Sequence, residues 1–527
     1  MPRHAPPHIR RWQVTFIVTV FVLAVAGAAV GGWWYARESS PHPGPIVLIS
    51  ADGLTPAQFS TPHITSTASV TPALDALAAD AIVFDRAYSH SPLTLPAHAS
   101  LLSGQLPFEH GVRDEAGFAL SEKSRPLAQL LRNRGFETGA AVSSFLLRPD
   151  TGLARGFSYF DAALPEPADG DELALDRDGA QTAEAATEWL RSRSGYRFLL
   201  FVQVDASAAE ETVAALVAEL KDRNLYNQAT IFVTSDHASD TDGLSITEEA
   251  LHVPLIVKQP NREGAGRHVE VTVQQIDLVP TILDLVRAPM PSGLGGRSLR
   301  ALLIDEKGRI PEQTIYAETL AARFRFGGFG HAALLSPEFR ELEPGEIHLP
   351  TEPTEIAAED VDRFAVVGNL GIPGLDGAAL APLSDADSAS IAKTHREASA
   401  LVAHHQYAAA IAKLRQITRA HPDIALIDYQ LGNLLGEVGR FDQAEAAFRA
   451  AARLEPDSPY IPLAEARMFL KAERLEAARD RAALALALSE IRNAPAVSAA
   501  QDVISQVAAA LDARQSLQDQ SLSRTSF

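Results

Sequence analysis

The polar residues best suited to chemistry stand at the ends of predicted apolar strands or at the predicted start of a helix. They are Asp52, Asp205, Asp236 and His237, which follow strands, and Thr94, which begins a helix. In a parallel sheet the carboxyl ends of the strands meet at one edge, and the ligand site of such sheets lies there. One crevice could therefore collect these carboxylates, the hydroxyl and the imidazole. We expect a ligand-binding or catalytic site at that edge.

The elements that must position these residues alternate between strands and helices from residue 46 onward. The predicted strands are Ile46–Ser50, Thr138–Val142, Phe198–Val204, Ala229–Ser235 and Val253–Lys258. The predicted helices are Pro72–Ala79, Pro126–Arg134, Thr182–Arg193 and Glu210–Asp222. Short apolar runs of this kind are typical of strands buried in a parallel sheet. Repeated strand–helix units predict an α/β fold, in which a mostly parallel sheet is sandwiched by helices.

From about Ser388 the sequence changes to Ala-rich helices that repeat every 34 residues or so. The best copy begins at Ala425 and contains Leu431, Gly432, Gly439, Phe441, Ala444, Phe448, Ala451 and Pro456. This spacing is typical of tetratricopeptide helix pairs, with an ordinary helical bundle as the alternative. We predict an all-α repeat domain over 386–515 and a tail over 516–527. Repeats of this type bind protein segments on their concave face, so we expect a protein partner.

The N-terminal segment predicts a membrane anchor. Residues 14–35 carry no charge, and they follow a stretch in which Arg3, Arg10 and Arg11 are the only charged side chains. A helix that crosses the hydrocarbon needs about 20 apolar residues, and basic flanks stay in the cytoplasm. We predict a cytoplasmic tail (1–11), a transmembrane helix (12–36) and a linker (37–45), with the bulk of the chain in the periplasm. A cleaved signal peptide is the alternative.

The composition excludes several classes of protein. The 527-residue chain has 66 acidic and 46 basic residues and a formal net charge of −20. Nucleic-acid backbones are bound mainly by Lys and Arg, so we expect no nucleic-acid partner. Because cysteine is absent, the protein has no disulfide, no thiolate zinc site and no cysteine nucleophile.

Longer motifs follow one another in an order that identifies a family. They read VLISADGL, TPALDALAADAIVFDRAYSHSPLTLPAHASLLSGQLPFEHGVRD, LAQLLRNRGFETGAAV, ATIFVTSDH, VPLIV and QIDLVPTILDL. On these motifs the chain from Ile46 to about Pro382 resembles the sulfatase-like branch of the alkaline phosphatase superfamily. We place the corresponding domain at 46–385. The resemblance implies an α/β enzyme that acts on a phosphate or sulfate ester.

The resemblance also assigns roles to individual residues. Family members attack the ester with a hydroxyl or a modified cysteine at the start of one helix, and Thr94 takes that position. The unpaired N–H groups and the dipole of a helix N-terminus would stabilise an anionic oxygen there. His98 stands where sulfatases carry the arginine of their signature, and His110 lies in the family's HG turn. Either histidine could donate to the charged oxygens of the substrate.

The same resemblance implies one divalent metal ion. Its ligands would be Asp52, Thr94, Asp236 and His237, a set of three oxygen donors and one nitrogen donor. This set suits Zn²⁺ best, and Mn²⁺ or Ca²⁺ would be tolerated.

Several positions depart from the family pattern. Sulfatases of the formylglycine type oxidise a cysteine or a serine to an aldehyde, whereas Thr94 would give a ketone. A one-metal arrangement with threonine resembles phosphoethanolamine transferases and related enzymes instead. The run Asp205-Ala206-Ser207 replaces Asp-Pro-His, and Gly53 replaces a common second acid. We therefore expect the second metal site of two-metal relatives to be missing.

Two functions stay open on this reading. The first is a membrane-anchored metallo-hydrolase or transferase that uses Thr94 as nucleophile and one metal ion. The second is a catalytically degenerate domain that serves, with the repeats, as a protein-interaction scaffold. A purely structural role is also an alternative for individual residues. Thr94 could be only a helix N-cap, and Asp205 could be only a helix cap.

Overall fold

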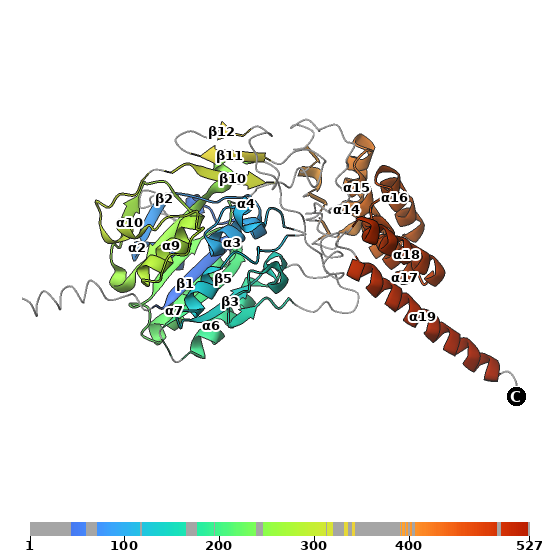
Figure 1. Ribbon diagram of the computed structural model, residues 1–527, viewed down its shortest axis with the longest axis horizontal. Coiled ribbons are helices and arrows are strands. Elements are labelled where there is room, and N and C mark those ends of the chain that lie inside the picture. The colour runs from blue at the N-terminus through green and yellow to red at the C-terminus, as the bar shows by residue number, and fades with distance from the viewer. Residues whose placement is uncertain are drawn as a thin grey trace, which may run out of the picture.

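The computed structural model describes residues 44–524 except for 59–70, 116–117, 165–175, 194, 196, 239–245, 312, 320–330, 336–339, 343–389, 392, 396, 399–400, 403–405 and 493–496. Within the described residues an α/β unit is followed by an all-helical unit, which Figure 1 colours from orange to red.

The main sheet of the α/β unit has nine strands in the order β4-β3-β5-β1-β6-β7-β2-β8, and β9 pairs with β2. Their bounds are β1 (Ile46–Asp52), β2 (Ile82–Tyr88), β3 (Glu137–Val142), β4 (Tyr159–Asp161), β5 (Phe198–Asp205), β6 (Thr230–Thr234), β7 (His252–Lys258), β8 (Arg267–Val269) and β9 (Val273–Gln274). All pairs are parallel except those of β7, which runs antiparallel to β2 and β6. The prediction of a mostly parallel sheet is confirmed.

Helices cover both faces of this sheet (Figure 1). They are α2 (Pro72–Ala79), α3 (Thr94–Ser103), α4 (Pro107–His110), α5 (Leu127–Arg132), α6 (Gly179–Arg191), α7 (Ala209–Asp222), α8 (Glu248–Leu251), α9 (Leu278–Leu285) and α10 (Arg300–Ile304). Short 3₁₀ turns are η1 (Pro56–Gln58), η2 (Phe145–Leu147), η3 (Pro149–Thr151), η4 (Ala206–Ala208), η5 (Pro260–Arg262) and η6 (Gln275–Asp277). Successive side chains of β1 point to opposite faces of the sheet, so the core has two halves. Leu48 packs with α3, α5 and α9 on one face, and Ile49 packs with α2, α6 and α7 on the other.

A second, antiparallel sheet was not predicted. It consists of β10 (Ile315–Thr319), β11 (His331–Leu335) and β12 (Arg340–Glu341). A buried ion pair fastens it to the α/β unit, because the Arg113 guanidinium donates to both oxygens of Glu318, with 2.7 Å between Nη2 and Oε2. The sequence interpretation missed this sheet because its strands are short.

The all-helical unit contains α14 (Tyr407–Ala420), α15 (Ala425–Glu437), α16 (Phe441–Leu454), α17 (Tyr460–Lys471), α18 (Leu475–Arg492) and α19 (Val497–Arg524). Successive helices pack as antiparallel pairs, and Gly439 turns the chain between α15 and α16 with a φ of +73°. The last helix extends beyond residue 515, where we placed the start of the tail. Its sequence contains no glycine or proline that would end the helix there.

Gly432 allows α15 and α16 to approach closely, and this contact gives the first testable prediction. A Cβ at Gly432 would lie 2.7 Å from the nearest Phe448 ring carbons, whereas a Cβ at Gly436 would lie 3.2 Å from the flexible Met468 side chain. Overpacking in a core costs about 1–3 kcal/mol, so Gly432→Ala should lower the free energy of unfolding of the helical unit. Gly436→Ala is the matched control in the same helix. Equal thermal unfolding of the two variants would contradict the predicted clash.

The two units share one buried apolar cluster. Leu93 and Phe145 of the α/β unit belong to the same cluster as Ile391, Tyr429 and Tyr460 of the helical unit. Leu93 is the residue directly before Thr94, and it is 4% exposed. The helical unit therefore shares buried surface with the segment that begins α3.

The predicted single-pass membrane arrangement is contradicted. Among the residues that the structure describes, no helix combines the length and the apolar character that crossing a membrane requires. The longest of them, α19, carries charged residues such as Asp502, Asp512 and Arg514 along its length. The segments predicted as tail (1–11) and transmembrane helix (12–36) lie outside the described residues.

Candidate active site

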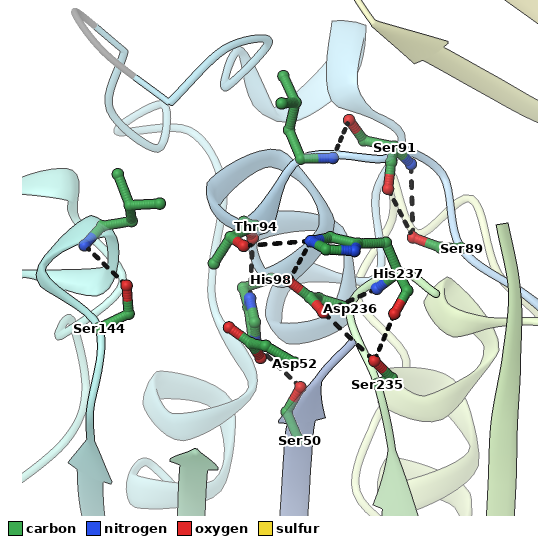
Figure 2. A network of polar contacts seen from close by, with 12 residues as sticks. Ser50, Asp52, Ser89, Ser91, Thr94, His98, Ser144, Ser235, Asp236 and His237 are labelled. Carbon is green, nitrogen blue, oxygen red and sulfur yellow. Dashed lines mark hydrogen bonds and ion pairs between the residues drawn. The ribbon is translucent and has the colours of Figure 1, made fainter. Parts of the chain in front are cut away.

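Two neighbouring strands bring two carboxylates together at the carboxyl edge of the sheet. Strands β1 and β6 pair in parallel, Asp52 is the last residue of β1, and Asp236 follows β6 by two residues. One ligand-capable atom each from Asp52, Asp236 and His98 lies within 4.8 Å of the others. Figure 2 shows these side chains converging, with Thr94 and His237 beside them. The structure thus brings together the four predicted metal ligands, and it places His98, which was predicted to contact the substrate, among the ligand atoms.

Thr94 occupies the first turn of α3 at the edge of this group. The backbone of Leu93 is extended, and Pro96 fits the first turn because an N–H there has no partner within the helix. The Thr94 side chain does not cap the helix, which argues against the purely structural reading. Its Oγ1 lies 3.4 Å from Nε2 of His237. Thr94 is buried, with 8% of its surface exposed.

The hydrogen bonds of His237 leave one ring nitrogen available. Its Nδ1 lies 2.8 Å from the carbonyl oxygen of Ala238, which can only accept, so Nδ1 carries the proton. In the neutral ring Nε2 then has a free lone pair, and this nitrogen faces Thr94 Oγ1 and, at 3.2 Å, Oδ2 of Asp236. A histidine held in this way can bind a cation through Nε2.

Hydrogen bonds to both ring nitrogens also fix the orientation of His98. Its Nδ1 donates to the carbonyl oxygen of Thr94 at 2.8 Å, and its Nε2 accepts from the Ser50 hydroxyl at 2.9 Å. Nε2 also lies 3.5 Å from Oδ1 of Asp52. Burial lowers the pKa of His98, which favours the neutral ring. Because its Nε2 is an acceptor that faces Ser50 and Asp52, His98 does not offer a proton to a substrate in this state.

Each of the two carboxylates has one satisfied oxygen and one without a hydrogen-bond donor. Oδ2 of Asp52 accepts from Gln203 at 2.7 Å, and Oδ1 of Asp236 accepts from the His237 N–H at 2.8 Å. Oδ1 of Asp52 and Oδ2 of Asp236 are buried and have no hydrogen-bond partner. Buried oxygens in a folded protein are normally satisfied. Two orphaned carboxylate oxygens beside imidazole lone pairs therefore fit a divalent cation.

The charges of the two carboxylates lead to the same conclusion. Burial and the nearby Asp236 raise the pKa of Asp52 well above its ordinary value. Although burial alone would raise it, the pKa of Asp236 is lowered by His237 and His98. The two pKa shifts have opposite directions, because two adjacent buried charges repel each other. A cation between them would remove that repulsion.

His110 lies outside this group. Its Nδ1 accepts from the Val112 N–H at 3.1 Å, and its Nε2 donates to the Ser100 hydroxyl at 3.0 Å. Burial, with smaller effects from His90 and Arg113, lowers its pKa to about 3. Both ring nitrogens serve the packing of the turn after α4, and neither is free for a substrate.

His110→Leu should therefore affect stability and leave the metal site unchanged. The substitution leaves the Val112 N–H and the Ser100 hydroxyl buried without a partner, which costs about 1–3 kcal/mol. We expect a lower free energy of unfolding in denaturant and an unchanged affinity of the folded protein for Zn²⁺. A variant that folds as stably as the wild type but no longer binds Zn²⁺ would place His110 in the site after all.

Asp205 also lies apart from the cluster. It ends β5 in register with Asp52, but its side chain is exposed and accepts from the Ser207 N–H at 2.8 Å as the N-cap of η4. The cap interpretation fits this geometry, and Asp205 holds no position among the converging ligand atoms.

Sequence reasoning missed two polar residues that support the site, Ser50 and Gln203. Both lie in strands whose other residues are mostly apolar. Ser50 stands two positions before Asp52 and Gln203 two positions before Asp205, so each lies on the same strand face as that Asp. They are also register partners across β1 and β5. A polar residue within an apolar strand, two positions before a terminal Asp, was the available signal.

Three family models match the chain. Residues 46–209 match the sulfatase family, and residues 241–320 match the C-terminal region of N-sulphoglucosamine sulphohydrolase. Residues 429–497 match a tetratricopeptide repeat family. The first two matches fall on the α/β unit, and the third falls on the helical unit.

Curated relatives match over parts of their length. Arylsulfatase K of Gallus gallus is 29% identical over 131 residues, which are 24% of this chain and 23% of that protein. The ulvan-active sulfatase of Formosa agariphila is 20% identical over 275 residues, 44% of this chain and 52% of that protein. The chain thus spans about a quarter of the length of the arylsulfatase K it matches.

Solved structures match parts of this chain at low identity. The phosphonate monoester hydrolase of Agrobacterium radiobacter is 17% identical, with a TM-score of 0.47, over 56% of this chain and 88% of that chain. The phosphonate monoester hydrolase of Silicibacter pomeroyi is 19% identical, with a TM-score of 0.45, over 55% and 85%.

Proposed function

We propose that this chain, which carries a sulfatase-like domain of the alkaline phosphatase superfamily followed by tetratricopeptide repeats, is a one-metal hydrolase or transferase of phosphate or sulfate esters. The observation that carries the proposal is the pair of orphaned buried carboxylate oxygens beside the Thr94 hydroxyl. We keep 46–385 and 386–515 as the boundaries of the two domains.

Asp52, Asp236, His237 and Thr94 would hold the cation, and His98 is a further candidate because its Nε2 lies in the same group. The oxygen-rich set with imidazole nitrogen suits Zn²⁺, while Mn²⁺ and Ca²⁺ are the alternatives. When bound, such an ion lowers the pKa of a neighbouring hydroxyl and stabilises negative charge on ester oxygens.

The residues of the chain supply the rest of the mechanism. The Thr94 oxygen bonds to the phosphorus or sulfur atom and the bond from that atom to the ester oxygen breaks. The proton that the Thr94 hydroxyl gives up is balanced by the proton that the leaving alcohol takes up. The first-turn N–H groups of α3 stabilise the negative oxygens of the bound group. Transfer of that group from Thr94 to water completes hydrolysis, and transfer to a second alcohol completes a transferase reaction. No formylglycine is required, because the hydroxyl of threonine is itself the nucleophile.

The test is direct. The purified full chain should bind about one equivalent of a divalent metal and hydrolyse an aryl phosphate, phosphonate or sulfate ester. Removal of the metal by a chelator should abolish turnover, and adding Zn²⁺ or Mn²⁺ back should restore it. The relative rates on the three esters identify the substrate class.

The scaffold hypothesis predicts a different result from the same experiment. It is favoured by Asp205, which is exposed and tied to its own turn in place of the Asp-Pro-His of two-metal relatives. Absence of both metal and turnover in the wild-type chain would support a degenerate domain. In either case we propose that the repeats bind a protein partner, as other repeats of this type do.

A further inference from the structure

Gln203 is a buried polar residue in the middle of the main sheet. It lies in β5 between β3 and β1, and it is 2% exposed. Its neighbours along the strand are the apolar residues Val202 and Val204, which are fully buried. An amide in such a place loses its contacts with water, so its hydrogen bonds must come from the protein.

The three hydrogen bonds of its side chain go to the ends of the two adjacent strands. The side-chain Oε1 accepts from the backbone N–H groups of Ser143 and Ser144 at 2.9 and 3.0 Å. The side-chain Nε2 donates to Oδ2 of Asp52 at 2.7 Å. The opposite orientation of the amide would direct its NH₂ group at two N–H donors and its oxygen at a carboxylate. These partners therefore fix which way the amide points.

From this geometry we propose that Gln203 is a positioning residue for the metal site. By holding Oδ2 of Asp52, it turns the carboxylate so that Oδ1 faces His98 and Asp236 and is free to bind the cation. The inference rests on the proposed function, because it explains how one of the proposed ligands is oriented.

Glutamine is the residue type that can make all three of these hydrogen bonds. Glutamine alone among residues of this length offers one acceptor for two N–H groups and one donor for a carboxylate. A glutamate would place a second carboxylate against Asp52, and a methionine would make none of the three hydrogen bonds. Groups that orient metal ligands in this way raise metal affinity by about 10–100-fold.

Gln259 provides a matched control. It is also 2% exposed, and its Nε2 donates to the carbonyl oxygens of Leu303 and Glu263 at 3.0 and 3.1 Å. It follows β7, which runs antiparallel to β6, so it lies at the sheet edge opposite the cluster. Replacing either glutamine by methionine removes a buried amide, but only Gln203 touches a proposed ligand.

The experiment compares Gln203→Met and Gln259→Met in the full chain. Zn²⁺ is titrated into metal-free protein by calorimetry, and thermal unfolding is recorded alongside. We expect both variants to unfold at lower temperature, and only Gln203→Met to bind Zn²⁺ about 10–100-fold more weakly than the wild type. Unchanged affinity of Gln203→Met, or equal weakening in both variants, overturns the positioning role and leaves the proposed function intact. A wild-type chain that does not bind Zn²⁺, Mn²⁺ or Ca²⁺ overturns the proposed function and this inference with it.

A second variant covers a failure of Gln203→Met to fold. Gln203→Asn keeps an amide but is one methylene shorter, so it cannot reach Asp52 while holding Ser143 and Ser144. It should weaken Zn²⁺ binding as well. Wild-type affinity in Gln203→Asn would show that any buried amide suffices and would overturn the proposal.

Discussion

Thr94→Ala should lower the rate of ester cleavage or transfer by about a thousandfold or more. The variant removes the only hydroxyl that the structure places at the start of α3 beside the converging ligand atoms. Loss of a nucleophile costs factors of this size or larger in enzymes that form a covalent intermediate. The fold should persist, because the Thr94 side chain makes no capping bond to α3.

Two variants make this result specific. Thr94→Ser keeps the hydroxyl and should retain most of the activity. Ser103→Ala removes a buried hydroxyl from the other end of the same helix, where it donates to the carbonyl oxygen of Ala99, and should leave the rate unchanged. Steady-state rates on an aryl phosphate and an aryl sulfate measure all three. If Thr94→Ala turns over as fast as the wild type, Thr94 has no part in the mechanism.

The position of the site could be predicted from the sequence because it depends only on the type and order of elements. Asp52 and Asp236 follow strands that any parallel arrangement would place at one edge, and the structure does bring them together. Thr94 joins them because the helix after β2 begins at the same edge. A residue that stands directly at the end of an element can thus be placed without knowing any side-chain torsion.

The orientation of side chains could not be predicted in this way. The sequence indicated that His98 and His110 could both donate to a substrate. In the structure, His98 directs an acceptor nitrogen at Ser50, and the two ring nitrogens of His110 bond to Val112 in its own turn and to Ser100 in α3. Those directions depend on which neighbours three-dimensional packing supplies. The role of Gln203 was hidden for the same reason, since its partners lie about 60 and 150 residues away in the chain.

The direction of β7 could not be predicted from the local sequence pattern either. Residues 253–258 read correctly as a strand, but the short apolar run is the same for either direction. The connection from β6 does not decide the direction either, because residues 235–251 are long enough for both arrangements. A parallel pair needs a crossover of about a dozen residues or more, usually a longer helix, whereas an antiparallel pair does not.

Asp236→Asn should abolish metal binding, and this is the second large effect that we expect. Asp236 is the carboxyl group of the pair whose pKa is lowered, so it supplies the negative charge that a cation would meet first. The amide keeps the shape of the side chain and still accepts from the His237 N–H, which spares the loop after β6. It removes one full charge from a ligand set in which only Asp52 and Asp236 are anionic. We expect the bound metal to fall below about a tenth of the wild-type content, and ester turnover to fall with it.

The stability of the same variant separates loss of the metal from loss of the fold. A ligand that binds only the folded state raises its stability by mass action, so adding Zn²⁺ should raise the unfolding temperature of the wild type and leave that of Asp236→Asn unchanged. Without metal the variant should be about as stable as the wild type, because the amide oxygen still accepts from the His237 N–H. Asp205→Asn, at the end of β5 on the other side of β1, is the control and should keep both the metal and the thermal shift. A Zn²⁺-induced shift of equal size in Asp236→Asn and the wild type would exclude Asp236 as a ligand, since the cation would then be held elsewhere.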